Sequence, residues 1–339
     1  MVRKISIPQL NTFSIVALDP ELGEIGMAVA SRAFDAGYYC TFLRSGVGGV
    51  TSQSFVNPHL GSAILDSLER GQPPTEALVA ALGQDELSPR RQVGVVDAQG
   101  RTAAFTGDEN GEWAGHLNAP NVSVQGNLLA GPGVIEAMLA AFLGAEGPLA
   151  DRLMLALEAG EAAGGDKRGK QSAALTVVRQ RGGYDGAHDR LVELKLTDHP
   201  DPIPELRRLF NLWKYHVITP SYARLAVEDP TQAERLYEHL GQYLNEALAA
   251  HYEDAHLYNS LAWFLAEKKL FPQQALKAAQ RAVLLAPDDS SILDTLAEAH
   301  FAAGDLVEAC TVAEQALQLD PDSDYLKGQL ARFQGAGKG

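Results

Sequence analysis

Thr12 is the residue whose type and position point most directly to chemistry, because it opens an apolar run that extends to Ala17. A threonine hydroxyl becomes a useful nucleophile when the α-amine of the same residue is free to act as the neighbouring base. Removal of residues 1–11 would free that amine. A β-branched residue also packs well at the start of a buried strand. The sequence therefore leaves two roles open for Thr12, a catalytic nucleophile and an ordinary strand residue.

Six further side chains could assist a nucleophile at Thr12 or hold its substrate: Asp166, Ser172, Arg32, Arg44, Gln125 and Asn127. The carboxylate and the serine could hydrogen-bond to the nucleophile, and the two amides could donate to a substrate oxyanion. The two arginines could pair with a carboxylate on the substrate. Each also has an ordinary structural alternative, as a turn cap, a strand residue, a turn residue or a member of an ion pair.

Two stretches resemble ligand-binding motifs but lack essential parts. Gly164, Gly169 and Lys170 have the spacing of a phosphate-binding loop, yet Gln171 follows where a magnesium-binding serine or threonine is needed. That loop also connects a helix to a strand, whereas a phosphate-binding loop leads from a strand into a helix. The histidines and aspartates between 188 and 201 do not have the spacing of metal ligands. We therefore expect no nucleotide hydrolysis, no metal and no other cofactor.

The composition is that of an acidic globular protein. The 339 residues are 46% hydrophobic and carry a formal net charge of −15, which is consistent with about two domains. No basic stripe or tail is present, so we expect no binding to nucleic acid or to a membrane. The only cysteines are Cys40 and Cys310, which excludes a disulfide framework. The N-terminus lacks the apolar core of a signal peptide, and we expect a cytoplasmic protein.

Strands alternate with pairs of helices between residues 12 and 200. Asp19-Pro20 and Gly23 predict the turn of an opening hairpin. Strands are expected at 12–17, 24–31, 38–44, 46–55, 92–97, 102–106, 122–125, 172–179 and 190–196. Helices are expected at 58–70, 74–82, 133–142 and 148–162. Antiparallel strands segregated from helix pairs predict an α+β fold.

Several motifs in this region, taken in order, resemble the bacterial domain-of-unknown-function family numbered 1028. They are Thr12 to Ala17, Asn57-Pro58, Arg91 to Ala98, Gln125-Gly126-Asn127 and Ala163 to Ala173. The resemblance covers about residues 12–210. It implies an N-terminal-nucleophile (Ntn) hydrolase-like fold of four layers, in which two antiparallel sheets lie between two helix pairs (αββα).

A weaker similarity to proteasome β subunits points to the same threonine. In those proteins the catalytic threonine starts the first strand, as Thr12 does, and an aspartate before a serine that opens a late strand resembles Asp166 and Ser172. The catalytic lysine of proteasomes has no clear counterpart. Arg44 is the nearest basic residue by position, but an arginine stays charged. The interval from aspartate to serine is also longer here, and residues 1–11 precede the threonine.

From about residue 231 the sequence predicts helices that repeat with a period of 34 residues. Small residues and helix-ending prolines recur at this spacing: Ala275, Ala279, Ala282 and Pro287 return as Ala309, Ala313, Ala316 and Pro321. The pattern is typical of tetratricopeptide repeats, which we place at about 255–288 and 289–322. Helices at 231–252 and 323–333 would serve as partial repeats or caps.

The sequence thus predicts an Ntn-hydrolase-like domain at 12–200, a helical linker at 201–230 and a tetratricopeptide-type repeat domain at 231–339. Two functions stay open. One is an amidohydrolase or peptidase of the Ntn class that uses Thr12, after removal of residues 1–11, on a small-molecule or peptide substrate. The other is a noncatalytic ligand-binding or adaptor protein whose repeats contact a protein partner. The repeats could also pack on the first domain or form a homo-oligomer.

Overall fold

The computed structural model describes residues 9–250 and 252–336, which form two compact units. The first unit contains the residues up to Trp213 together with Arg224–Arg235. The second contains Lys214–Ala223 together with the residues from Leu236 onward. In this part of the chain no helix is both long and apolar enough to cross a lipid bilayer.

A six-stranded antiparallel sheet contains the strand that begins with Thr12. In spatial order its strands are β11 (Arg190–Leu196), β10 (Ser172–Val178), β3 (Glu24–Ser31), β2 (Thr12–Asp19), β9 (Val122–Gly126) and β8 (Gly115–Ala119). Every residue of β2 and β3 is buried. Both strands are central in the sheet and are covered on both faces, which explains why their sequences are apolar with little alternation.

A five-stranded antiparallel sheet faces the first. It contains β1 (Gln9–Leu10), β5 (Gly48–Phe55), β6 (Arg91–Asp97) and β7 (Thr102–Thr106), and β4 (Thr41–Arg44) also pairs with β5. The chain leaves this sheet at Leu10 and enters the other at Thr12. The single residue Asn11 therefore connects the two sheets.

The β2–β3 hairpin sets the register at Thr12. The Asp19 carboxylate accepts hydrogen bonds from two backbone N–H groups of the turn, at 2.9 and 3.2 Å. Gly23 has φ +66°, a conformation that glycine adopts at little steric cost. With the turn fixed in this way, Thr12 lies directly opposite Ser31. Paired residues of adjacent strands share one face of the sheet, so the two hydroxyl side chains are neighbours.

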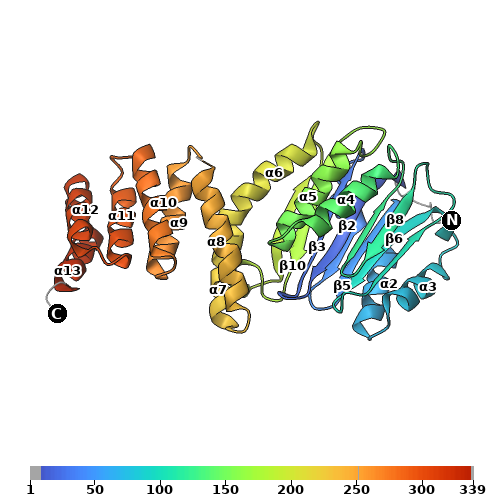
Figure 1. Cartoon of the computed structure of the whole chain (residues 1–339), viewed down its shortest axis with the longest axis horizontal. Coiled ribbons are helices and arrows are strands. Elements are labelled where there is room, and N and C mark those ends of the chain that lie inside the picture. The colour runs from blue at the N-terminus through green and yellow to red at the C-terminus, as the bar shows by residue number, and fades with distance from the viewer. Residues whose placement is uncertain (1–8, 251, 337–339) are drawn as a thin grey trace, which may run out of the picture. The chain divides into compact units, whose positions relative to one another are not determined.

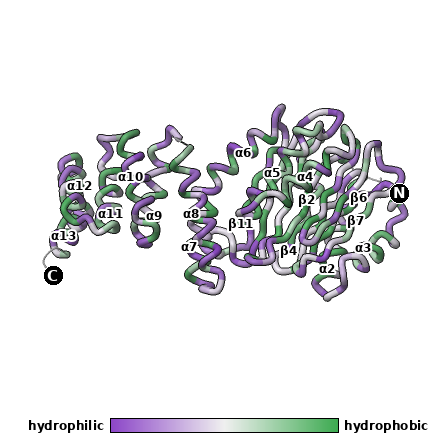
Figure 2. The backbone as a smooth tube through the Cα atoms, viewed as in Figure 1, coloured by the Kyte–Doolittle hydropathy of each residue, from purple (hydrophilic) through white to green (hydrophobic). Residues whose placement is uncertain are grey.

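Helix pairs cover the outer faces of the two sheets (Figure 1). α4 (Gly133–Gly144) and α5 (Leu149–Ala162) pack on the six-stranded sheet, while α2 (Pro58–Glu69) and α3 (Pro74–Leu82) pack on the five-stranded sheet. Apolar residues are concentrated in the strands and in these covering helices (Figure 2). The four-layer α+β arrangement expected from the sequence is confirmed.

Two elements of this unit differ from the expectation. The stretch expected as a strand from residue 38 begins as a helix, α1 (Ala36–Cys40), and becomes extended only at β4. The Asp35 carboxylate caps this helix by accepting a hydrogen bond from the Tyr38 N–H at 3.2 Å. The edge strand β8 was not expected, because polar residues such as His116 and Asn118 interrupt its apolar pattern. The unit also contains α6 (Pro202–Trp213) and 3-10 turns at Ser88–Arg90 and Tyr184–Gly186.

The other described residues, 214–250 and 252–336, form helices joined by short connections, as expected from about residue 231 onward. A π-helical turn at Lys214–Ile218 and α7 (Thr219–Glu228) are followed by α8 (Ala233–Ala249), α9 (Ala255–Glu267), α10 (Pro272–Leu285), α11 (Ser290–Ala302), α12 (Leu306–Leu319) and α13 (Asp324–Ala336). The six recurring alanines of α10 and α12 are all 0% exposed. Their small side chains allow α10 to pack closely on α9, and α12 on α11.

A buried carboxylate links α11 to α13 in the second unit. Asp294 is 8% exposed and accepts a hydrogen bond from the Gln329 side chain. Glu298, which forms an ion pair with Arg332, belongs to the same cluster. Burial raises the pKa of Asp294 to about 6, and the negative charge of Glu298 acts in the same direction.

We predict that Asp294→Asn stabilises the second unit at pH 7.5 by about 1–3 kcal/mol. The folded chain holds the Asp294 proton more tightly than the unfolded chain does. Wild-type stability therefore falls as the pH rises from about 4 to about 6, and a neutral amide removes this loss. The gain should nearly vanish at pH 4.

Thermal unfolding at both pH values, followed by circular dichroism, measures this difference. Asp322→Asn, at an exposed position of the same unit, is the control and should change little at either pH. An equal effect of Asp294→Asn at pH 4 and pH 7.5 would contradict the assignment.

Candidate functional site

Thr12 is fully buried at the start of β2, in the centre of the six-stranded sheet. Its hydroxyl donates a hydrogen bond to the carbonyl oxygen of Leu10 at 2.9 Å. Ser14, two residues further along, hydrogen-bonds Gln53 of the facing sheet at 2.6 Å. Alternate residues of a strand share a face, so Thr12 also points into the space between the sheets.

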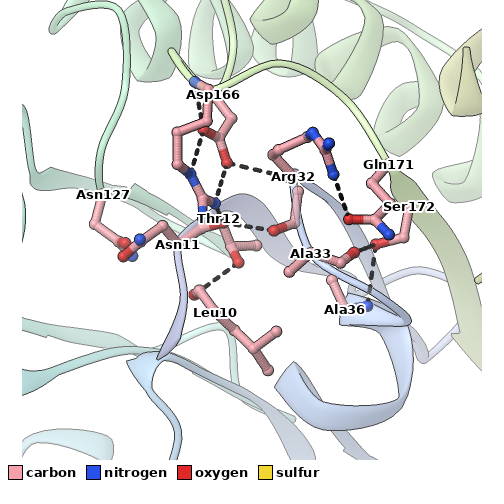
Figure 3. A network of polar contacts seen from close by, with 12 residues as sticks. Leu10, Asn11, Thr12, Arg32, Ala33, Ala36, Asn127, Asp166, Gln171 and Ser172 are labelled. Atoms are coloured by element: carbon pink, nitrogen blue, oxygen red, sulfur yellow. Dashed lines mark hydrogen bonds and ion pairs between the residues drawn. The ribbon is translucent and has the colours of Figure 1, made fainter. Parts of the chain in front are cut away.

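Two side chains hold the peptide bond that joins Asn11 to Thr12, both of which are labelled in Figure 3. The carbonyl oxygen of Asn11 accepts a hydrogen bond from the Ser31 hydroxyl at 2.5 Å and another from the Arg168 guanidinium at 2.9 Å. A hydroxyl and a positive charge that converge on one carbonyl oxygen have the geometry of an oxyanion hole. They are placed to stabilise negative charge on this oxygen if the carbonyl carbon is attacked.

Asp166 fixes the Arg168 guanidinium in this position. Its Oδ1 accepts a hydrogen bond from Nε at 3.0 Å and its Oδ2 accepts one from Nη2 at 2.6 Å, which makes a bidentate pair. Oδ2 also accepts a hydrogen bond from the backbone N–H of Arg32 at 3.1 Å. The loop turns back toward the sheet through Gly164 and Gly169, whose φ angles of +113° and +111° favour glycine. Asp166 therefore reaches the Thr12 region through Arg168.

The Thr12 hydroxyl has no hydrogen bond to a basic side chain among the residues that the structure describes. Its partners are the Leu10 carbonyl and the thiol of Cys40. Burial raises the pKa of Cys40 to about 12, although its hydrogen bond with Thr12 acts in the opposite direction. The thiol is protonated at neutral pH and serves neither as base nor as nucleophile. The α-amine that could act as base is here part of the peptide bond with Asn11.

Two of the sequence candidates, Ser172 and Arg32, form contacts of their own beside this site (Figure 3). The Ser172 hydroxyl donates to the carbonyl oxygen of Ala33 at 2.6 Å and accepts from the Ala36 N–H at 3.1 Å. It thereby supports the start of α1. The Arg32 guanidinium is exposed and donates to the Gln171 side chain at 2.6 Å.

The two candidate amides belong to a buried network between the sheets. Gln125 donates to the Ser14 hydroxyl at 2.7 Å, and the Asn127 side chain donates to the Gln92 side-chain oxygen at 2.8 Å. Gln53 donates to the same oxygen of Gln92 at 2.8 Å. All four amide side chains are 0% exposed. The network joins the two sheets.

Asn127 is the member of this network that also contacts the threonine. Its backbone N–H donates to the carbonyl oxygen of Thr12 at 3.1 Å. Its side-chain oxygen has no hydrogen-bond partner within the described part of the chain. Close packing of the network depends on Gly94, since a Cβ there would lie 1.9 Å from the amide oxygen of Gln125.

Arg44 lies on β4, where it is committed to two carboxylates of α2. Its guanidinium forms ion pairs with Asp66 at 2.9 Å and Glu69 at 2.5 Å. These contacts hold β4 against α2 and neutralise the charge that was considered for substrate binding.

A groove with a volume of about 800 Å³ opens beside the Asp166 loop. Trp113, His116 and Lys167 contribute to its lining, and burial lowers the pKa of His116. Another cavity, of about 650 Å³, lies at the Gly23 turn, at the opposite end of the hairpin from Thr12.

Across residues 9–250 and 252–336, no group of three or more histidine, cysteine, aspartate or glutamate side chains is placed to hold a metal ion.

Neither donor to the Asn11 carbonyl was among the candidate residues expected from the sequence, although a signal for each was present. The hairpin turn fixes the register of β2 on β3, and counting back from it pairs Ser31 with Thr12. Arg168 follows the candidate Asp166 by two residues, close enough for its side chain to fold back onto that carboxylate. The contact with Cys40 had no local signal, because it depends on how α1 packs.

Comparison with known proteins gives one family match and one repeat match, in different parts of the sequence. A family described as of unknown function, DUF1028, matches residues 12–206, and a tetratricopeptide repeat matches residues 290–333. A crystal structure of a Silicibacter pomeroyi protein described as DUF1028 is 32% identical, with a TM-score of 0.56, and the match covers 60% of this chain and 86% of that one. An NMR structure of the second tetratricopeptide domain of human RPAP3 with an HSP70 peptide is 24% identical, with a TM-score of 0.26, and the match covers 30% of this chain and 84% of that one. No curated protein sequence matches the chain.

We predict that Gln92→Leu lowers the free energy of unfolding by about 2–4 kcal/mol, because it leaves buried partners such as the Asn127 side chain unsatisfied. Urea unfolding followed by circular dichroism measures the change. Gln84→Leu, at an exposed position in the same unit, is the control and should change stability by less than about 0.5 kcal/mol. Equal stability of Gln92→Leu and the wild type would show that the network does not hold the sheets together.

Proposed function

The chain belongs to DUF1028, a family of unknown function, and we propose that its first unit is an amide-bond hydrolase whose nucleophile is the Thr12 hydroxyl. One observation carries the proposal: the carbonyl oxygen of Asn11 receives hydrogen bonds from both Ser31 and Arg168. This carbonyl belongs to the bond that must break to free the Thr12 amine. The chain would first cut itself between Asn11 and Thr12 and then act on an external amide.

Self-cleavage would begin with attack of Thr12 Oγ1 on the carbonyl carbon of Asn11. Negative charge then forms on the oxygen that Ser31 and Arg168 already hold. The hydroxyl proton is transferred to the amide nitrogen as the carbon–nitrogen bond breaks, which leaves an ester between the two residues and a free α-amine. Water hydrolyses the ester, giving a carboxylate on Asn11 and a free hydroxyl on Thr12.

The freed α-amine would supply the base that the Thr12 hydroxyl lacks. It takes the hydroxyl proton during attack on a substrate amide and returns it to the leaving amine, after which water resolves the acyl-enzyme. The carbonyl oxygen of the substrate would replace that of Asn11 between Ser31 and Arg168. Removal of one such donor typically slows a reaction about 10²- to 10³-fold.

A second function is favoured by the packing of the segment before Thr12. Leu10 is 1% exposed and its backbone pairs with β5, so removal of residues 1–11 would break folded contacts. If the segment stays attached, Thr12 has no free amine and the unit is noncatalytic. The protein would then act as a ligand-binding or adaptor protein, whose tetratricopeptide repeats hold a protein partner, as stacked repeats commonly do.

We predict that Arg168→Ala slows scission between Asn11 and Thr12 about 100-fold, because one donor to the developing oxyanion is lost. Thr12→Ala should abolish scission, whereas Thr12→Ser should retain it, since serine keeps the hydroxyl. The intact mass of the purified chain, recorded over time, measures each rate.

Arg190→Ala is the matched control. Arg190 is an exposed arginine of the same unit that pairs with Glu193 at 2.9 Å, and its loss should leave the rate of scission unchanged. Thermal unfolding establishes that Arg168→Ala is folded. If this folded variant is cut at the wild-type rate, Arg168 is not an oxyanion donor.

A further inference from the structure

We propose that the site takes the acyl part of its substrate as an extended peptide that pairs with β5, with a leucine-sized apolar side chain immediately before the residue whose carbonyl is attacked. This inference rests on the proposed function of Thr12 and names the substrate class of that site. The observation behind it is the course of residues 9–11, which are joined to Thr12 by the bond that would be cut.

Residues 9–11 occupy the place of an acyl group. Asn11 is attached to Thr12 through its carbonyl carbon, and the attacking hydroxyl belongs to the same threonine. The segment that precedes this carbonyl therefore follows the path that a substrate acyl chain would follow when its own carbonyl lies between Ser31 and Arg168. Enzymes bind a substrate most productively when such contacts place its carbonyl next to the nucleophile.

The edge of β5 that lies away from β6 is suited to receive a peptide strand. β4 covers one end of this edge, from Gly48 to Thr51. The other end is paired only with Gln9 and Leu10 of β1, opposite Phe55 and Ser54, as far as the described residues show. Without β1 the backbone groups of that end would be an open edge. An open edge binds an extended chain by adding a strand.

Ser54 lies at the end of the β5 edge that pairs with β1. It is opposite Leu10 in the register and has φ +70°, a strained conformation for a residue other than glycine. Its hydroxyl is buried and has no hydrogen-bond partner among the residues described. The strand position beside Leu10 thus has an unused polar group, which a substrate could engage.

The pocket around Leu10 is apolar. Leu10 is 1% exposed and packs with Cys40 and Val56, and Ala33 and Tyr39 border the same cluster. Burial keeps the Cys40 thiol protonated by raising its pKa, so the pocket carries no charge at neutral pH. A leucine-sized side chain fills this space, whereas a carboxylate would be buried there with no positively charged side chain among these cluster residues to pair with it.

Binding of a peptide in trans tests the inference apart from catalysis. The probe is fluorescein-labelled Ile-Pro-Gln-Leu-Asn amide, which has the sequence of residues 7–11. The protein is the full chain with Thr12→Ala, which prevents scission, combined with Leu10→Asp, which expels β1 from its pocket. Leu10→Ala with Thr12→Ala provides a second and milder version that keeps an apolar side chain. Fluorescence anisotropy gives the dissociation constants, and circular dichroism establishes folding.

We expect the probe to bind the Leu10→Asp chain about 10- to 100-fold more tightly than a probe with aspartate in place of its leucine. The matched control, Thr12→Ala alone, keeps β1 in the site and should bind the probe at least tenfold more weakly. The inference is overturned if no folded variant binds the probe, or if the leucine and aspartate probes bind equally.

Failure of this inference and failure of the proposed function give different results. If the probe binds as expected but the wild-type chain is never cut before Thr12, the peptide site stands and the catalytic proposal fails. If the wild-type chain is cut but no folded variant binds the probe, Thr12 is the nucleophile and the substrate is not a peptide bound along β5.

Discussion

The hydrogen bonds to the carbonyl group of Asn11 fix the connection between the two sheets of the first unit. The chain passes there from the five-stranded sheet to the six-stranded sheet in a single residue. The hydrogen bonds from Ser31 and Arg168 fix the carbonyl, and Asp166 fixes Arg168 in turn. The same three side chains that hold this crossing also polarise the peptide bond before Thr12. The contacts that stabilise the connection between the two sheets are therefore the same contacts that would stabilise the oxyanion during cleavage.

The buried amide side chains hold in place the residues around the connection at Asn11. Polar groups that are removed from water must find partners inside the protein, and an unsatisfied one is costly. Gln53 and Gln92 of one sheet form hydrogen bonds with Gln125 of β9 and with Asn127, which follows β9, so the sheets cannot slide without breaking several hydrogen bonds at once. Gln53 and Asn127 each donate to the Thr12 carbonyl. The position of the threonine is thereby tied to both sheets.

The pattern of the sequence was sufficient to predict the α+β class and the repeats, and the resemblance to family 1028 implied the four layers. Alanines spaced 34 residues apart predicted the close helix pairs, because small side chains at a fixed period mark the places where two helices can approach each other. Asp19-Pro20 and Gly23 predicted the hairpin, and its register contained the information that Ser31 lies beside Thr12. Local propensity did not predict the edge strand β8, because its residues are largely polar. It also predicted a strand at Tyr38 and its neighbours, which instead form the capped helix α1.

The roles of the candidate site residues were harder to predict, because they depend on contacts between distant segments. Gln125 and Asn127 were expected to present amide groups to a substrate, but their partners Gln53 on β5 and Gln92 on β6 follow from the register of one sheet on the other. No local pattern specifies that register. Asp166 was identified from its place before a late strand, whereas its link to Asn11 through Arg168 requires the folded loop.

Cleavage of the bond between Asn11 and Thr12 in the folded chain is tested most directly by the N-terminal sequence and intact mass of the purified full chain. We expect a chain that begins at Thr12, and a Thr12→Ala chain that keeps the residues before position 12. If both chains keep residue 11 attached after prolonged incubation under native conditions, Thr12 has no free amine, and the hydrolase proposal is contradicted.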